Sequence, residues 1–210
     1  MTCPVCGICT RIRTISKPRN YHQLLAMQRK FQAIMFTDSV KAAQERYTER
    51  PPIAHDKPEE VEIDQLGESE FEFIRERDSF YLATVNEDGW PYMQFRGGPA
   101  GFVKPLDGNA LGFVDFSGNR HFVSTGNVAA NDRVSIFFMD YANKRRLKIL
   151  AHAAITEAAA NPELLEAVSL GDYRGRVERV VRLDVVAFEW SCPQHITPRF
   201  TQEEFREMGL

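Results

Sequence analysis

Residues 80–95 read FYLATVNEDGWPYMQF, and this stretch decides the fold. Two apolar runs of strand length, FYLATV and WPYMQF, stand on either side of the polar segment NEDG at residues 86–89. An Asp-Gly pair between two such runs is a strong hairpin signal, because glycine tolerates the left-handed backbone of a tight turn. The stretch therefore predicts two antiparallel strands.

The same pattern continues along the chain. FVKPL (102–106), the turn DGN and LGFVDF (111–116) form a second predicted hairpin, and further strands are expected at 134–141, 147–155 and 177–190. Helical spacing is found at 37–47, 68–78, 121–131, 161–168 and 201–208. In 68–78, Phe71 and Ile74 are expected toward the core, with Phe73 as a further candidate. Many strands joined by tight turns, with helices at the ends and crossovers, predict a mainly β protein with flanking α-helices. We expect an antiparallel, Greek-key-like six-stranded barrel.

Three segments of different character are expected. Residues 65–210 would form the barrel domain, 31–64 a helical arm and proline-marked linker, and 1–30 a basic, disordered extension. The extension would be a disordered tail, an Arg-rich targeting peptide, or the product of an upstream start codon, with Met27 or Met35 as the true first residue; we favour the first or the last. Cys3, Cys6 and Cys9, with His22 as a fourth ligand, leave a metal-dependent regulator open, although we expect no metal.

Composition limits the classes of function. Hydrophobic residues make up 43% and charged residues 26% of the chain, which is typical of a soluble globular protein. No apolar run approaches the roughly 20 residues of a membrane span, so we expect no membrane partner. The net charge is -3, and residues 1–30 carry only basic charges, so the remainder is more acidic still. That argues against a nucleic-acid partner. A single body cysteine, Cys192, indicates a reducing cytoplasm.

Positively charged side chains recur near strand ends and turns, and small residues flank several of them, as in RGGP (96–99) and FSGNR (116–120). Glycine lets the backbone approach a ligand closely, and arginine holds phosphate through paired donors. Asn119 and Arg120 also open a helical segment, whose positive end favours anions. The pattern indicates a phosphate-bearing ligand lying across the barrel. Ordinary turn glycines and surface arginines are the alternative. The charged set is Arg96, Lys104, Arg120, Arg145, Arg146 and Lys148.

The order of four segments resembles the core of the pyridoxamine 5'-phosphate oxidase-like split β-barrel family, which binds flavin mononucleotide (FMN). The segments are GWPYMQF (89–95), ALGFVDFSGNR (110–120), NVAANDRVSIFF (127–138) and RRLKILAHA (145–153). The resemblance covers roughly residues 65–200, and WSCPQHITPRF (190–200) is similar to one bacterial subgroup. It implies a split β-barrel, a homodimer with FMN at the subunit interface, and hydride or electron transfer between the flavin and a small-molecule redox substrate.

Carried over by position, the resemblance assigns residues to the cofactor. Gln94 takes the place of an arginine at the FMN phosphate, and Arg96 would replace that arginine. Asn119 and Arg120 match an Arg-Lys pair that clamps the phosphate. The expected cofactor contacts are Gln94, Arg96, Gly97, Lys104, Phe113, Val114, Ser117, Asn119, Arg120, Arg145 and Arg146. Trp190, His195 and Arg199 fall on the substrate side, and no catalytic side chain is assigned.

The departures from the family concern the substrate. The oxidases' C-terminal motif of the type Arg-x-His-Asp-Arg is absent, and CPQHITPRF (192–200) stands in its place. A buried vitamin B6 phosphate would need those groups, because an unpaired phosphate is costly to remove from water. Vitamin B6 oxidation is therefore not expected. Two alternatives stay open: a flavin- or tetrapyrrole-binding protein without turnover, and a protein that uses the deazaflavin F420.

Overall fold

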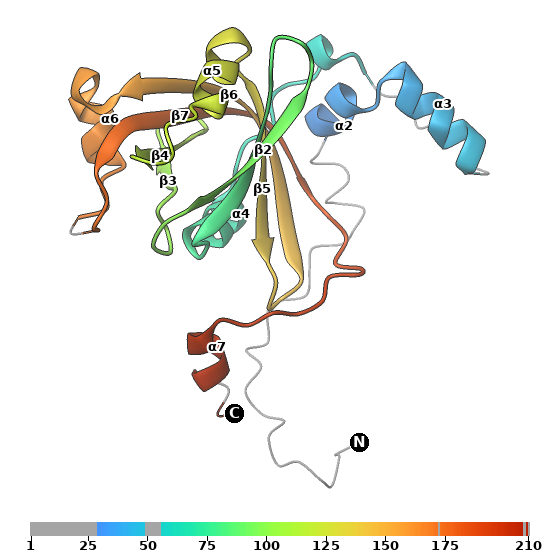
Figure 1. The fold of residues 1–210 in the computed structure, drawn as a ribbon. Helices are drawn as coiled ribbons and strands as arrows, with labels where there is room; N and C mark the ends of the chain where they lie inside the picture. Colours follow the sequence, from blue (N-terminus) through green and yellow to red (C-terminus); the bar gives the residue numbers. More distant parts are fainter. Residues whose placement is uncertain (1–28, 49–55, 172, 208, 210) are drawn as a thin grey trace, which may run out of the picture.

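The computed structural model describes residues 29–48, 56–171, 173–207 and 209 of the chain. Its centre is a curved sheet in which all hydrogen-bonded neighbours are antiparallel, in the order β2-β1-β5-β6-β7-β4-β3 (Figure 1). The strands are β1 (Ser79–Val85), β2 (Pro91–Gly97), β3 (Lys104–Leu106), β4 (Ala110–Phe116), β5 (Arg133–Asp140), β6 (Arg145–Glu157) and β7 (Val177–Trp190).

The structure confirms the predicted mainly β split barrel with short helices. The sheet has seven strands where a six-stranded barrel was expected, because the short β3 pairs with the edge of β4. It also stays open, since the strands at its two ends, β2 and β3, do not pair with each other. Contacts between side chains must therefore hold the two ends of the sheet together.

Both predicted hairpins form. In the first, Asn86 Oδ1 accepts hydrogen bonds from the backbone N–H groups of Asp88 and Trp90, at 3.1 and 2.8 Å. Gly89 has φ +83°, a conformation that strongly favours glycine. In the second, Asn109 Nδ2 donates to the carbonyl of Val185 at 3.0 Å and so ties the turn to β7. Polar turn side chains thus fix the register of β1 with β2 and of β4 with β7.

The core contains a cluster of phenylalanines whose rings contact one another. The ring of Phe80 on β1 lies 5.6, 5.2 and 5.3 Å, between centroids, from those of Phe102, Phe113 and Phe138. All four side chains are buried. Such aromatic contacts stabilise a fold by roughly 0.5–1.5 kcal/mol per pair beyond the area that they bury. Because the rings come from β1, β4, β5 and the loop before β3, they join strands that are distant in the sheet.

The described residues form six helices: α2 (Arg29–Met35), α3 (Asp38–Tyr47), α4 (Glu68–Arg75), α5 (Val123–Ala130), α6 (Pro162–Ala167) and α7 (Gln202–Glu207). Short 3-10 turns lie at Pro58–Glu60 and Ala158–Ala160. As expected, α3 begins after Thr37 and α6 has Pro162 in its first turn. In α4 the buried residues are Glu70, Phe73 and Ile74, whereas Phe71, expected in the core, is only half-buried.

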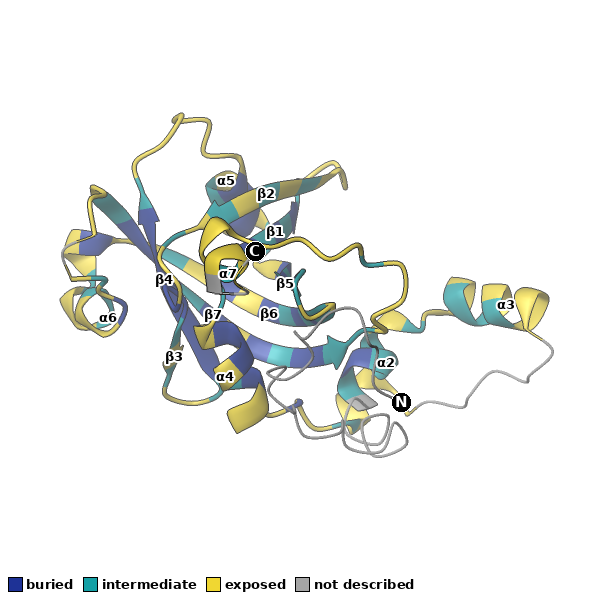
Figure 2. Cartoon of the chain, turned by 90° about the horizontal axis from the view of Figure 1, so that it is seen from below, coloured by how far each residue is buried: buried dark blue, intermediate teal, exposed yellow. Residues whose placement is uncertain are grey.

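The helical arm contacts the barrel through α2, which lies against β7, and through the linker at Asp64. Lys30 Nζ joins α2 to the linker by donating to the carbonyls of Pro58 and Val61, at 2.6 and 2.8 Å. The Asp64 carboxylate accepts a hydrogen bond from the backbone N–H of Phe188 on β7. Burial raises the pKa of the Asp64 carboxyl above its ordinary value. Beyond α2 the arm extends away from the barrel, and α3 contains no buried residue (Figure 2).

The predicted extension, with Cys3, Cys6, Cys9 and His22, lies outside the described residues. None of the helices in the described part of the chain has the length and apolarity that a membrane-spanning helix requires.

Gly112 on β4 marks a close approach between the sheet and the segment that follows α6. A Cβ atom there would lie 2.6 Å from Val168 Cγ1 and 2.7 Å from Leu106 Cδ1. We expect Gly112→Ala to lower the free energy of unfolding by about 1–3 kcal/mol, through overpacking, as measured by urea denaturation. Gly126→Ala is the control, because nothing lies within 4 Å of its Cβ position and alanine favours the helix. Equal stability of the two variants would contradict the packing argument.

Candidate functional site

A buried carboxylate joins three strands. Asp115 on β4 accepts hydrogen bonds from Arg96 Nη1 on β2 and from Arg179 Nε on β7, the latter at 2.9 Å. Asp115 and Arg179 are only 5% and 8% exposed. Burying an ion costs free energy unless it is paired and hydrogen-bonded, and here both charges are. Since β2 and β4 are not neighbours in the sheet, the Arg96–Asp115 pair crosses the interior between them.

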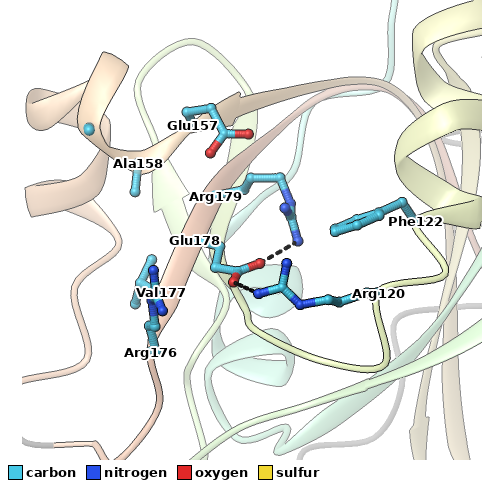
Figure 3. A pocket seen from close by; sticks show the side chains of 9 residues that line it. Arg120, Phe122, Glu157, Ala158, Arg176, Val177, Glu178 and Arg179 are labelled. Atoms are coloured by element: carbon cyan, nitrogen blue, oxygen red, sulfur yellow. Dashed lines mark ion pairs between the residues drawn. The ribbon is translucent and has the colours of Figure 1, made fainter.

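A second carboxylate extends this network to the surface. Glu178 Oε1 lies 3.6 Å from Arg120 Nη2, and Glu178 Oε2 lies 3.4 Å from Arg179 Nη2 (Figure 3). The ring of Phe122 covers the Arg179 guanidinium at 4.9 Å from its centroid. Three arginines and two glutamates line one open cavity of about 390 Å³: Arg120, Arg176, Arg179, Glu157 and Glu178, with Phe122, Ala158, Ala159 and Val177.

The loop that carries Arg120 has an unusual backbone. Arg120 and Phe122 both have left-handed φ values, +59° and +52°. This region is rarely populated by residues other than glycine and costs of the order of 1 kcal/mol per residue, and such strain gathers at functional sites. The loop is held by a hydrogen bond from Ser117 N to the Arg176 carbonyl at 2.9 Å and by one from His121 N to Asn119 Oδ1. It thereby keeps Arg120 opposite Glu178.

One donor of the network has no partner in the part of the chain that the structure describes. Arg96 Nε is buried and makes no hydrogen bond with the described residues, although Arg96 Nη1 binds Asp115. Buried hydrogen-bond donors without a partner are rare in folded proteins. Each costs free energy of folding, which other interactions in the protein must offset. Arg96 does not line the cavity; it reaches the cavity through Asp115 and Arg179. The site is therefore an inner pair, Arg96 with Asp115, behind an outer group of arginines.

The family model for pyridoxamine 5'-phosphate oxidase matches residues 66–187, which is more than half of the chain and includes every strand except the end of β7. The chain belongs to the pyridoxamine 5'-phosphate oxidase family. The Arg96–Asp115–Arg179 network and the cavity beside it lie within the matched residues.

Solved structures are similar at low sequence identity. HupZ from Group A Streptococcus is 14% identical with a TM-score of 0.47, over 65% of this chain and 100% of that one. An F420 reductase is 23% identical with a TM-score of 0.39, over 56% and 94%. HutZ, the heme storage protein from Vibrio cholerae, is 20% identical with a TM-score of 0.36, over 58% and 90%. No curated protein sequence matches the chain.

Among the residues that resemblance to this family assigned to the cofactor, those of the FSGNR segment lie at the cavity or beside it. Arg120 lines the cavity, and Ser117 and Asn119 hold its loop. Gln94 instead contacts α5, where its Oε1 accepts a hydrogen bond from Ser124 Oγ at 2.8 Å. Gly97 ends β2, and Lys104 pairs with Gly112 on β4.

Two of the assigned residues have side chains in the core of the barrel. Phe113 packs against Phe80 and Phe102, and Val114 belongs to a smaller apolar cluster beside α6. Both side chains are buried. A ligand outside the core would therefore reach only the backbone of these two residues.

Arg145 and Trp190 form a separate network next to α4. The Arg145 guanidinium lies 4.9 Å from the ring centroids of both Phe73 and Trp190. Trp190 Nε1 donates a hydrogen bond to Glu70 Oε1 at 2.8 Å. Arg146, the next residue, has a buried Nε without a hydrogen-bond partner among the described residues. These contacts stabilise the start of β6 and the end of β7.

His195 and Arg199 lie in the exposed segment after β7. His195 has a left-handed φ of +63°, and the Arg199 guanidinium covers the ring of Tyr141 at 5.0 Å from its centroid. The hydroxyl groups of Tyr141 and Tyr81 lie 3.5 Å apart. This hydrogen bond, together with partial burial, raises the pKa of Tyr141 above its ordinary value. The segment is thus attached to the barrel near the outer face of β1.

The sequence interpretation missed Asp115, Glu178, Arg179 and Arg176. A signal for two of them was present. Arg179 shares the strand face of Val181 and Leu183, and Asp115 interrupts the apolar run LGFVDF. A charge at a core position of a strand indicates a buried ion pair, because a single buried charge is very costly.

We expect Asp115→Ala to destabilise the protein by about 3–5 kcal/mol, because it leaves Arg96 and Arg179 without their buried counter-charge. Urea denaturation followed by circular dichroism measures the change. Asp184→Ala is the matched control: its pair with Arg182 is exposed and should contribute less than about 1 kcal/mol. A loss at Asp115 no larger than the loss at Asp184 would show that the buried network does not stabilise the fold.

Proposed function

We propose that the protein binds FMN, with the phosphate held by Arg120 and Arg179, and that it works as an FMN-dependent oxidoreductase. The observation that carries this proposal is the convergence of Arg120, Arg176 and Arg179 on one cavity. Guanidinium groups hold phosphate through charge-assisted, paired hydrogen bonds. Membership of the pyridoxamine 5'-phosphate oxidase family supports a phosphate-bearing flavin as the ligand.

The residues of the site fit a phosphate group. Arg179 is oriented by Asp115 through Nε, and its Nη2 faces the Glu178 carboxylate at 3.4 Å, so this part of the guanidinium already binds an anionic group. Arg120 has a side chain that is 69% exposed and makes one long ion pair, so it can turn toward a ligand at little cost. The cavity volume of about 390 Å³ lies within the range of roughly 300–1,000 Å³ that small-molecule sites occupy.

Bound FMN would supply hydride or electron transfer through its flavin ring. The chain's own residues would bind and orient the cofactor: Asp115 fixes Arg179, and the strained loop presents Arg120. Vitamin B6 is not the proposed substrate, because His195 and Arg199 in the segment that replaces the oxidase motif are exposed rather than gathered at the cavity. The proposed substrate is another small redox molecule. The exposed thiol of Cys192 favours the reducing cytoplasm as the location.

The absorption spectrum of the freshly purified protein, with the mass of the molecule that denaturation releases, tests this function. A flavin spectrum and released FMN are expected, together with oxidation of a reduced nicotinamide or another donor. A colourless protein that takes up no FMN would contradict the proposal. If denaturation releases F420 or a tetrapyrrole, that molecule and not FMN is the protein's ligand. If FMN is released but no donor is oxidised, the protein binds flavin and is not an enzyme.

We expect Arg120→Ala to weaken FMN binding about tenfold or more while the affinity for riboflavin, which lacks the phosphate, changes little. Quenching of flavin fluorescence measures both dissociation constants. Arg182→Ala is the control, because Arg182 is also a partly exposed arginine in an ion pair but lies outside the cavity. An equal loss for FMN and riboflavin would exclude a phosphate contact by Arg120.

We also propose that the protein is a homodimer, with the outer face of β1, β2 and β5 against a second copy. Outward-facing positions of an antiparallel sheet are usually polar. Here they hold a row of three aromatic residues, because Tyr81 on β1 is the cross-strand neighbour of both Phe95 on β2 and Phe137 on β5. Met93 and Phe95 are 66% and 60% exposed. Exposed apolar patches of this kind mark interfaces. A second copy would offer the same patch, so that a two-fold contact buries both, and the FMN site would lie at the subunit interface as in the family.

Phe95→Asp should weaken the dimer about a hundredfold or more, because a carboxylate would be buried without a partner in the interface. Sedimentation equilibrium at several protein concentrations measures the dissociation constant. Tyr47→Asp on α3, an exposed aromatic residue far from the patch in the sequence, is the control. A monomeric wild-type protein, or a Phe95→Asp dimer of unchanged strength, would overturn this assignment of the face.

A further inference from the structure

We propose that Glu178 is a built-in competitor for the ligand's phosphate: its carboxylate lies between Arg120 and Arg179, where the phosphate would bind. The inference rests on the phosphate-binding role proposed above and adds the residue that limits affinity at that site. In the absence of ligand, Glu178 neutralises the two arginines. When a ligand binds, Glu178 must leave, and part of the binding free energy is spent on displacing it.

The geometry is that of an anion between two cations. One carboxylate oxygen faces Arg120 Nη2 at 3.6 Å, and the other faces Arg179 Nη2 at 3.4 Å (Figure 3). The Glu178 side chain is only 14% exposed, so its charge depends on the arginines rather than on water. Two guanidinium groups that converge on one anion form the arrangement that also holds a phosphate. The carboxylate and the phosphate therefore compete for the same donors.

Glu178 can be displaced without loss of the inner network. Its two ion pairs are longer than the 2.9 Å hydrogen bond from Arg179 Nε to Asp115. Asp115 holds Arg179 through a different nitrogen, so Arg179 stays in place when Glu178 moves. Arg120 is mostly exposed and loses little when its partner changes. The two carboxylates thus have separate roles: Asp115 orients Arg179, and Glu178 occupies its free side.

The charge balance selects the kind of ligand. The cavity is lined by three arginines and two glutamates, a small positive excess. A phosphomonoester carries about -1.5 to -2 charges at neutral pH, more than the single charge of a carboxylate. It therefore gains from replacing Glu178, whereas a neutral ligand such as riboflavin has no group that takes its place. Glu178 favours ligands with a terminal phosphate and excludes those without one from this end of the cavity.

Glu178→Gln tests the inference, because the amide keeps the size of the side chain and removes its charge. We expect FMN to bind roughly fivefold to tenfold more tightly to the variant, and riboflavin to bind within about twofold of its wild-type affinity. The ligand-free variant should have a lower Tm, because Arg120 and Arg179 lose the charge of Glu178 and only Arg179 keeps a second carboxylate, Asp115. Glu157→Gln is the matched control: it removes the same charge from the same cavity, and Glu157 has no ion pair among the described residues. Its effect on FMN affinity should be smaller.

Unchanged or weaker FMN binding in Glu178→Gln would overturn the inference, because Glu178 would then be neutral or would position the arginines. Inorganic phosphate gives a second readout that does not depend on flavin: the rise of Tm in phosphate relative to chloride at equal ionic strength. We expect a larger rise in Glu178→Gln than in the wild type, and equal rises would also overturn the inference. If neither protein binds flavin but the phosphate effect is larger in the variant, the FMN function is wrong and the role of Glu178 stands.

Discussion

The structure depends on the buried carboxylate of Asp115, which holds Arg96 of β2 and Arg179 of β7 at the same time. The sheet is open, and no hydrogen bonds join its two ends. The ion pair and the phenylalanine cluster around Phe80 join β1 and β2 to β4 and β7. The rings would stabilise many relative positions of the strands, because hydrophobic contact has little direction. The charged hydrogen bonds are directional, so they fix one of these positions.

The same carboxylate determines how the candidate site is arranged. Asp115 uses Nε of Arg179 and leaves the Nη atoms toward the cavity, where Glu178 lies. The loop after β4 then places Arg120 on the other side of Glu178, at the cost of left-handed backbone at Arg120 and Phe122. In the proposed site, the inner pair would stabilise the fold, and the outer arginines would exchange one anion for another. Stability and binding are thus divided between two carboxylates that share one arginine.

The sequence predicted those parts of the fold that short-range patterns specify. The turns at 86–89 and 107–109, the long β7 and the start of α6 were all found from turn residues, strand periodicity and a proline, and the structure confirms them. The family was also identified correctly from the order of four segments. For α4 the short apolar cluster FEFI did not distinguish the buried face, so Phe71 was expected in the core beside Ile74, with Phe73 only as a further candidate.

The site was only partly predictable, because its contacts depend on the curvature of the sheet. Arg120 was proposed from the small residues beside it, and Arg96 from its position on β2. Their partners were not, since Asp115 and Arg179 are 64 residues apart in the chain and meet only through strand pairing. Arg145 and Trp190 show the converse: both were assigned by resemblance, and in this chain both contact Phe73.

A crystal structure of the protein with FMN tests the central claim most directly, because it locates the phosphate relative to the two carboxylates. The account predicts phosphate oxygens within hydrogen-bond distance of Arg120 and Arg179, with Glu178 turned away and Asp115 still bound to Arg179. A phosphate bound elsewhere, or one that displaces Asp115 while Glu178 keeps its place between the arginines, would contradict it.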